Sequence, residues 1–184
     1  SCGLEYVLDA EGFCYHCRPR PETRRLKQEA VRRFLDERLS AFPYAYYDQM
    51  LERGRCVRYR PDFMWLQGTH NVILEVDEHQ HRGYAQGCEC YRLYELRAEY
   101  ECDLTVVRYN PDRYRNGRVS LNPSPAERYK TLYTILYNAL RTPPEVELKL
   151  IYLYYDNEYT EGELPVKVCC LDPLPAELVE RMQE

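Results

Sequence analysis

Apolar side chains recur at three- or four-residue intervals in three segments of the chain, which predicts three amphipathic helices. The segments are Glu22–Leu39, Glu89–Glu101 and Pro123–Leu140, and a shorter terminal helix is expected over Pro173–Glu184. Pro43 follows the first segment and ends it. The expected inward-facing residues of the three longer helices are Leu26, Ala30, Val31, Phe34, Leu35 and Leu39, then Leu93 and Leu96, then Tyr129, Leu132, Tyr133, Leu136 and Leu140.

Shorter apolar runs bounded by turn residues predict strands. The clearest is Val72–Asp77, a nearly continuous β-branched run that turns acidic at its end, as expected for a strand buried on both faces. The succession of helix, three strands, helix and strand predicts an α/β fold with a central mixed β-sheet flanked by helices. The other expected strands are Tyr44–Leu51, Val57–Tyr59, Phe63–Gln67, Leu104–Tyr109 and Val146–Tyr155, with a turn at Gly68–Asn71.

The composition narrows the ways in which the chain can bind nucleic acid. Its 184 residues suffice for one domain, or for a domain with a small appendage. The formal net charge is −5, whereas proteins that rely on nonspecific affinity for nucleic acids are usually basic. Contacts with DNA must then come from local basic patches, from a homodimer or from a further DNA-binding module. Nineteen tyrosines against four phenylalanines predict many half-buried rings, or reflect a plain compositional bias.

A cysteine-rich stretch at the start of the chain is expected to form a small extension, residues 1–20, in front of a main domain over residues 21–184. Pro19 and Pro21 make the connection between the two stiff. The chain has nine cysteines, an odd number, and no apolar run long enough to span a membrane. These features favour free or zinc-bound cysteines in an intracellular, reducing compartment such as the nucleus or cytoplasm, with no membrane association.

The spacing of the cysteines suggests a ligand set for structural zinc. Cys14 and Cys17 have the Cys-x-x-Cys spacing of zinc sites, and Cys2 can supply a third thiolate. The candidates for the fourth ligand are His16, Cys88 and Cys90. Such a site would stiffen both the extension and the loop that contains Cys88. The alternative is that these cysteines are free or simply buried, and Cys169-Cys170 is expected to be a pair of small apolar residues in a strand.

Three carboxylates near two strand ends are the strongest chemical signal in the sequence. Asp62 follows Pro61 at the start of one predicted strand. Glu75 and Asp77 lie on one face of the next strand, because side chains alternate with a period of two. Pairing of the two strands would bring the three acids together. Such acids repel one another unless a cation lies between them, and oxygen ligands favour Mg²⁺ or Mn²⁺ over Zn²⁺.

Polar side chains that follow the second strand fit the same chemistry. An ion held by the acids would serve phosphodiester hydrolysis, in which His81 can act as general base or general acid and Gln80 can orient water or bind phosphate. The alternative is ordinary: acid pairs at strand ends are usually solvated or salt-bridged, and a His-x-His pair usually lies on the surface. The metal site is favoured because burying Glu75 inside an apolar strand without a partner is costly.

The motif resembles a known nuclease superfamily. The sequences Arg-Pro-Asp-Phe at residues 60–63 and Ile-Leu-Glu-Val-Asp-Glu-His-Gln-His at residues 73–81 resemble the PD-(D/E)xK restriction-endonuclease-like superfamily. The resemblance is closest to the branch of very-short-patch repair (Vsr-like) and EDxHD nucleases, whose following acid, arginine and leucine match Glu89, Arg92 and Leu96. It covers about residues 22–112, with residues 113–184 as C-terminal additions. Residues 106–112 also resemble proteins of large DNA viruses and algae, which makes a viral origin an option.

The resemblance implies roles for individual residues. Asp62 corresponds to the metal-binding Asp and Glu75 to the acid of the signature, whereas Asp77 stands where the signature has Lys. His81 corresponds to the catalytic His of the EDxHD pattern, and we expect it to replace the absent Lys in activating water. The remaining acids of that pattern would be Glu89 and, on the first helix, Glu29 or else Glu22.

The expected function is that of a Mg²⁺- or Mn²⁺-dependent endonuclease that hydrolyses DNA phosphodiester bonds, with RNA a less favoured substrate. Arg25 and Arg32 on the first helix, and Arg58 and Arg60 before Asp62, are candidates for phosphate contacts. A solvated helix face explains the helical pair equally well. Two alternatives remain open: a nuclease-fold module that has lost catalysis and binds nucleic acid or protein, and a zinc-stabilised protein-interaction domain.

Overall fold

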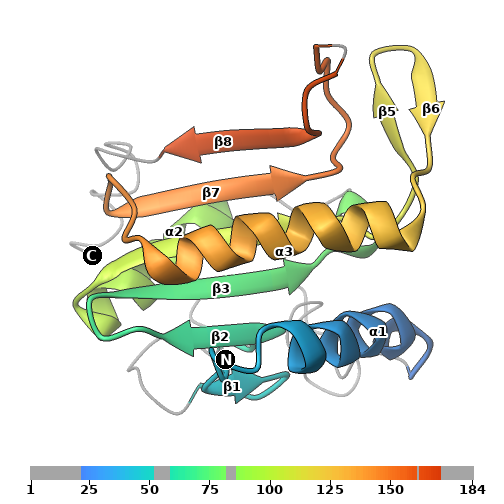
Figure 1. Ribbon diagram of the computed structural model, residues 1–184. Coiled ribbons are helices and arrows are strands. Elements are labelled where there is room, and N and C mark those ends of the chain that lie inside the picture. Colours follow the sequence, from blue (N-terminus) through green and yellow to red (C-terminus); the bar gives the residue numbers. More distant parts are fainter. Residues whose placement is uncertain (1–21, 52–58, 82–85, 161, 171–184) are drawn as a thin grey trace, which may run out of the picture.

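Helices and strands follow one another along the chain in the order that the apolar pattern predicts. The computed structural model describes residues 22–51, 59–81, 86–160 and 162–170, with only the main chain for residues 22–25, 81 and 86–91. The elements, shown in Figure 1, are α1 (Glu22–Arg38), β1 (Tyr46–Tyr47), β2 (Phe63–Leu66), β3 (His70–Val76), the 3-10 turn η1 (Glu78–His81), α2 (Gln86–Tyr100), β4 (Asp103–Tyr109), β5 (Tyr114–Asn116), β6 (Val119–Leu121), α3 (Pro125–Arg141), β7 (Leu148–Leu153) and β8 (Val166–Cys170).

One mixed sheet of six strands forms the centre of the described chain. Its strand order is β1-β2-β3-β4-β7-β8, and β5 and β6 form a separate hairpin beside the start of α3 (Figure 1). The pairs β3–β4 and β4–β7 are parallel, whereas β1–β2, β2–β3 and β7–β8 are antiparallel. The predicted α/β class with a central mixed sheet flanked by helices is therefore confirmed.

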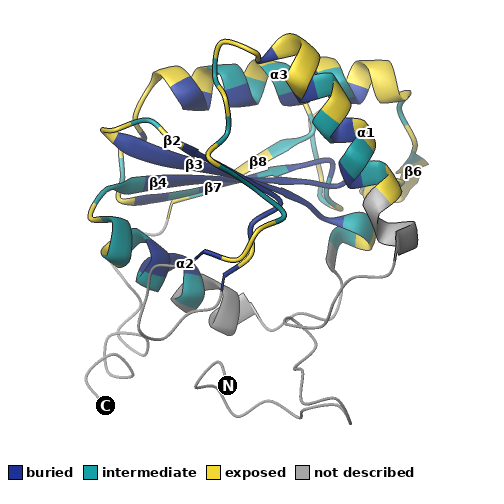
Figure 2. Cartoon of the chain, turned by 90° about the horizontal axis from the view of Figure 1, so that it is seen from below, coloured by how far each residue is buried: buried dark blue, intermediate teal, exposed yellow. Residues whose placement is uncertain are grey.

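Helices cover both faces of the sheet. Figure 2 shows α1 and α3 on one face, α2 on the other, and the buried strands between them. All seven residues of β3 are buried, which explains its nearly continuous apolar sequence. Leu74 and Val76 pack in the core beneath α1 and α3, and Ile73 packs with Leu93 and Leu96 of α2. By alternation, Glu75 also points to the α2 face.

The connections that leave β3 and β4 run to opposite faces of the sheet. After β3 the chain passes to α2, and after β4 it passes by way of the β5–β6 hairpin to α3 (Figure 1, Figure 2). Because the two strands are parallel neighbours, their carboxyl ends meet at one edge, between Val76 and Tyr109. In open α/β sheets this is where a crevice for a ligand forms.

The structure corrects several details of the sequence prediction. The buried apolar residues of α1 are Val31 and Leu35, with Leu39 just after its end, whereas Leu26 is 72% exposed and Ala30 is also exposed. The true inward stripe is shifted round the helix because α1 packs against α3 and the sheet with the face centred on Leu35. The strand expected over residues 44–51 is reduced to the two residues of β1.

Other predictions concern elements that are confirmed, missed or not described. The three long helices lie within three residues of their expected bounds, and Cys169 and Cys170 are in β8 as expected. The β5–β6 hairpin was not predicted. The cysteine-rich extension, Val57 and the helix expected over residues 173–184 lie outside the described residues. Among the helices that are described, none has the length and apolar character needed to cross a membrane.

Candidate active site at the carboxyl ends of β3 and β4

The acids singled out in the sequence lie at the sheet edge where β2 begins and β3 ends. Asp62, Glu75 and Asp77 are 1%, 7% and 0% exposed, so all three are buried. In the antiparallel β2–β3 pair, Phe63 is opposite Leu74, and extending this register by one residue puts Asp62 opposite Glu75. Directly opposite residues of an antiparallel pair point to the same face. The Asp62 carboxylate also accepts a hydrogen bond of 2.7 Å from the main-chain N–H of Val76, which fixes it at the strand end.

Glu75 is held by a tyrosine on the α2 face. The hydroxyl of Tyr59 donates a 2.7 Å hydrogen bond to Oε1 of Glu75. The Tyr59 ring packs in the core on the α2 side, and the guanidinium of Arg92, from α2, lies 5.3 Å from the centre of that ring. Arg92 therefore contacts the ring of the tyrosine that binds Glu75.

Asp77 is paired with a cation from the neighbouring strand. Arg108 of β4 lies opposite Glu75 in the parallel register, and its Nε donates a hydrogen bond to Oδ2 of Asp77. The hydroxyl of Tyr155 donates to the same oxygen. Burial, and after it the charge of Asp77, raises the pKa of Tyr155, so that hydroxyl remains a donor at neutral pH. Asp77 is thus a partner of Arg108 and Tyr155.

Arg108 was missed in the sequence analysis. Its side chain is 5% exposed, and a buried guanidinium is costly unless it is paired. The sequence held a usable signal, because a single Arg interrupts the apolar strand at residues 104–109 just as Glu75 interrupts β3. What the sequence did not contain is the register that sets Arg108 opposite Glu75.

The three acids do not form a three-ligand metal site. Among the residues the structure describes, no three His, Cys, Asp or Glu side chains are grouped closely enough to hold a metal ion. Asp77 contacts Arg108, and Asp62 and Glu75 occupy facing positions of β2 and β3. Mg²⁺ is commonly bound by one or two protein carboxylates, with water and phosphate oxygens completing its shell.

The turn that follows Asp77 has an unusual main chain. His79 and Gln80 have φ angles of 56° and 59°, in the left-handed region that side chains other than glycine rarely adopt. The Gln80 side chain is turned toward Asp156: its amide donates to Oδ1 at 2.7 Å and accepts from the Asp156 N–H at 2.9 Å. The Gln80 side chain thus ties the turn to Asp156, and its role in orienting water or binding phosphate stays a prediction. His81 ends the turn, and its side chain lies outside the described residues.

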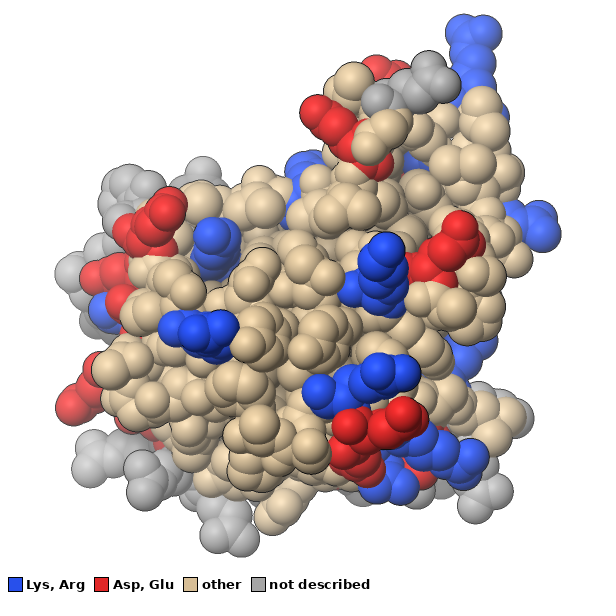
Figure 3. Space-filling model, viewed as in Figure 1, with Lys and Arg blue, Asp and Glu red and all other residues tan. Residues whose placement is uncertain are grey.

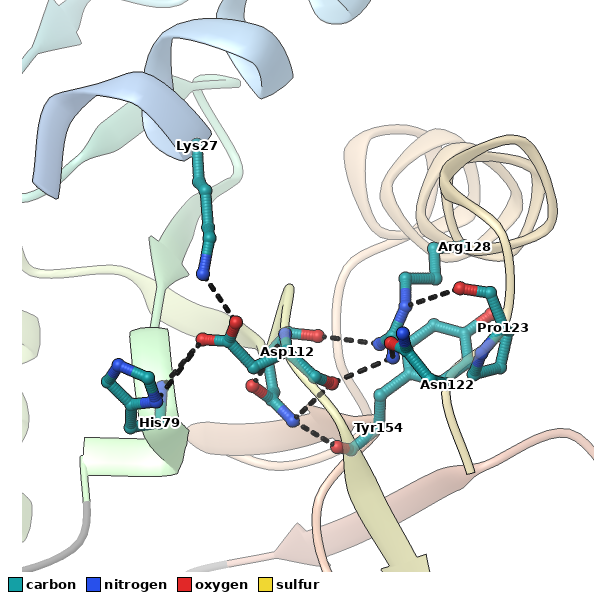
Figure 4. Close-up of polar contacts among 8 residues, drawn as sticks. Lys27, His79, Asp112, Asn122, Pro123, Arg128 and Tyr154 are labelled. Carbon is teal, nitrogen blue, oxygen red and sulfur yellow. Dashed lines mark hydrogen bonds and ion pairs between the residues drawn. The ribbon is translucent and has the colours of Figure 1, made fainter. Parts of the chain in front are cut away.

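A second polar cluster lies at the same sheet edge, on the side of α1 and α3. Figure 4 shows Lys27 of α1 and His79 of the turn directed at the carboxylate of Asp112, which follows β4. Burial alone would raise the pKa of Asp112, but hydrogen bonds from Lys27 and from the His79 N–H lower it below its usual value. A cleft of about 720 Å³ runs between the starts of α1 and α3 past these residues.

Glu29 and Arg32 form an ion pair on α1. Arg32 donates to both Glu29 oxygens, at 2.9 and 2.6 Å, and also to Asp36. These bonds from Arg32, opposed by burial and helped by Tyr47, lower the pKa of Glu29 to about 2. Tyr47 packs on Phe63, in the core beneath α1 and α3. Glu29 therefore lies on the opposite face of the sheet from Glu75, and the structure does not bring it to the acid pair.

The remaining candidates divide into paired residues and residues outside the description. Arg60 donates to the main chain and the carboxylate of Asp48, at 2.9 Å in each case. On the face seen in Figure 3, Lys and Arg side chains form separate small groups rather than a continuous basic patch. The side chains outside the described part of the chain are those of Cys2, Cys14, Cys17, Glu22, Arg25, Arg58, Cys88, Glu89 and Cys90.

Comparisons with known proteins do not assign the chain to a group. No family model matches it, and neither the curated proteins nor the solved structures contain a significant match.

Proposed function

We propose that this chain is a divalent-metal-dependent endonuclease domain that hydrolyses phosphodiester bonds of DNA, with a restriction-endonuclease-like core over residues 22–112. The observation that carries the proposal is the buried pair of Asp62 and Glu75, on facing positions of β2 and β3. The pair lies at the edge where β3 and β4 send the chain to opposite faces, the usual place for a ligand in such sheets.

Particular residues would hold the cation. Asp62 and Glu75 supply hard oxygen ligands, and Tyr59 orients Glu75 by its 2.7 Å hydrogen bond. Mg²⁺ or Mn²⁺ bound there would supply charge neutralisation at the phosphoryl oxygens and a lowered pKa for a bound water. His81, at the end of the η1 turn, is the proposed acceptor of the proton that the attacking water loses.

Arg108 takes the place of the missing signature lysine as the buried positive charge of the site. It comes from β4, whereas the signature places its lysine two residues after the acid, where Asp77 stands. Its hydrogen bond to Asp77 keeps that carboxylate away from the cation, so we assign Arg108 a positioning role. Arg92, which lies over the Tyr59 ring at 5.3 Å, is the proposed contact for a phosphate at the rim of the site.

A second candidate function is a nuclease-fold module that binds a partner without cleaving it. The observation that favours it is the pairing of Asp77 with Arg108, since an acid and an arginine replace the usual water-activating lysine. In that case, structural zinc on Cys14, Cys17, Cys2 and Cys88 would be the only metal in the protein. Elemental analysis measures the zinc, and less than about half an equivalent per chain argues against a closed site.

A cleavage assay separates the two candidates. The full chain is incubated with supercoiled plasmid, single-stranded DNA and RNA, each with Mg²⁺, with Mn²⁺ or with EDTA. We expect metal-dependent nicking of DNA that is lost in Asp62→Asn, Glu75→Gln and His81→Ala. The matched control is Glu145→Gln, which makes the same chemical change at an exposed residue before β7, at the opposite sheet edge. Activity that survives in both Asp62→Asn and Glu75→Gln rejects the assigned site.

A further inference from the structure

The left-handed turn at His79 and Gln80 is the most unusual stretch of main chain beside the acid pair. Two consecutive non-glycine residues in this region carry a conformational cost, and such turns persist only where their surroundings hold them. The turn begins directly after Asp77, whose main-chain oxygen accepts a hydrogen bond of 3.1 Å from the N–H of Gln80. Whatever holds the turn therefore also fixes the end of β3.

Asp112 holds the turn from one side. Its Oδ2 accepts the N–H of His79 at 3.0 Å, and the ring Nδ1 of His79 lies 3.7 Å from the same oxygen (Figure 4). Asp112 is itself fixed: its N–H donates to Asn110, and its main-chain oxygen accepts from Arg128 at 2.7 Å. Asn110 and Arg128 are 0% and 2% exposed, so Asp112 is held by two buried residues.

Asp156 holds the turn from the other side. Its carboxylate and its N–H bind the two ends of the Gln80 amide, at 2.7 and 2.9 Å. The same carboxylate oxygen accepts the main-chain N–H of Arg115 at 2.8 Å, and Asn157 donates to the main chain of Arg115 at 3.1 Å. The segment after β7 is thereby tied to the β5–β6 hairpin and, through Gln80, to the turn.

We infer that Asp112 and Asp156 are positioning residues that clamp the 78–81 turn from its two sides and so preorganise the end of β3 for the acid pair. The role in catalysis rests on the proposed function, whereas the clamp itself can be tested without any cleavage. Asp112 follows β4 and Asp156 follows β7, so the turn after β3 is hydrogen-bonded to the segments that leave the other two strands of the parallel part of the sheet.

Amide hydrogen exchange measured by NMR tests the clamp directly. Asp112→Ala removes the acceptor of the His79 N–H, and we expect that amide to exchange about tenfold faster. Asp112→Asn keeps an acceptor oxygen of the same shape and should restore most of the protection. Lys27→Met, the matched control, removes only the ion pair to Asp112 and should leave the exchange of His79 unchanged. Equal protection in Asp112→Ala and in the unmodified protein overturns the inference.

A second variant keeps the inference testable if Asp112→Ala does not fold. Gln80→Ala cuts the contact with Asp156 and leaves Asp112 intact, so exchange of the Gln80 and His79 amides should again accelerate at an unchanged melting temperature. In the cleavage assay, both Asp112→Ala and Gln80→Ala should lower kcat with little change in KM. If the unmodified protein does not cleave, the proposed function fails while the exchange data still decide on the clamp. Unchanged exchange in Gln80→Ala rejects the Asp156 side.

Discussion

The two sides of one sheet edge satisfy buried charge in different ways. On the α2 side, Asp77 is paired with the side chain of Arg108, Glu75 accepts a hydrogen bond from the Tyr59 hydroxyl, and Asp62 accepts one from the Val76 N–H. On the α1 and α3 side, the buried guanidinium of Arg128 donates to main-chain oxygens of Asn110, Asp112 and Pro123. Of the five buried charged residues in the described chain, three are carboxylates, and all three lie on the α2 side with a single arginine.

Under the function proposed above, the two arrangements have different roles. Main-chain oxygens around Arg128 are fixed by the fold and tie three segments together. Carboxylates buried at one edge of a sheet would be stabilised by a cation bound between them. We therefore place the proposed ligand site on the α2 side and expect the other side to serve as a structural framework.

The largest expected effect is a loss of cleavage activity, and it should differ between an Asp-to-Asn change on the α2 side and one on the α1 and α3 side. Asp62→Asn keeps an oxygen that can accept the Val76 N–H but weakens the cation ligand, so cleavage should fall by about 100-fold or more. Asp112→Asn, at the same edge, keeps its acceptor role and should lower cleavage by no more than about threefold. Initial rates of plasmid nicking measure both. Similar losses of cleavage in Asp62→Asn and Asp112→Asn would contradict the assignment of different roles to the two sides of the sheet edge.

The next largest effect concerns stability. Arg108→Met leaves the buried Asp77 without its cation and should cost about 3 kcal/mol in urea unfolding. Adding Asp77→Asn removes the uncompensated charge and should recover about 2 kcal/mol, a coupling that a double-mutant cycle measures. The matched cycle uses Arg128→Met, whose partners are neutral oxygens. The unfolding free-energy changes of Asp77→Asn and Arg128→Met should sum to that of the double variant within about 0.5 kcal/mol. A larger coupling between Asp77 and Arg128 would mean that the two hydrogen-bond networks act as one.

The sequence predicted the acid pair because its signals are local. An acid inside an apolar strand and an acid after Pro61 can both be read within a few residues, and the alternation of side chains gives the face. The strand register that pairs Arg108 with Asp77 depends on contacts 31 residues apart, which no local pattern contains. The resemblance pointed to Glu29, yet its position on α1 sets it on the other face, with Arg32 and Tyr47.

The fold prediction was also accurate where the pattern is local and long, and poor where distant contacts decide the structure. Periodicity gave the three long helices and β3 because their apolar patterns extend over several turns or residues. The β5 and β6 strands have three residues each, and β8 alternates weakly with exposed and half-buried residues, so their sequences carry little pattern. In α1, apolar residues lie on more than one face, and only packing against α3 selects Leu35 over Leu26.

A smaller effect tests the assignment of Glu29 to the structural side. Its pKa is lowered from 4.5 to about 2 in the folded state, so the stabilisation is complete above pH 4.5 and is lost as the pH falls toward 2. Because the pair is part-exposed, Glu29→Gln should cost only about 1 kcal/mol at pH 7 and nothing near pH 2. Urea unfolding at several pH values measures the difference. A loss of cleavage without this pH trend would return Glu29 to the site.

The smallest expected effect lies in the cleft on the α1 side. Leu26 lines the cleft and is 72% exposed, so Leu26→Ser should change the free energy of unfolding by less than about 0.5 kcal/mol. Val31, one and a half turns further along α1, is 1% exposed, and Val31→Ala should cost about 2 kcal/mol because it leaves a cavity in the core. Thermal unfolding of the two variants compares them under one condition. A larger loss for Leu26→Ser would mean that α1 packs with the face that its sequence first suggested, and the separation of Glu29 from the acid pair would then fail with it.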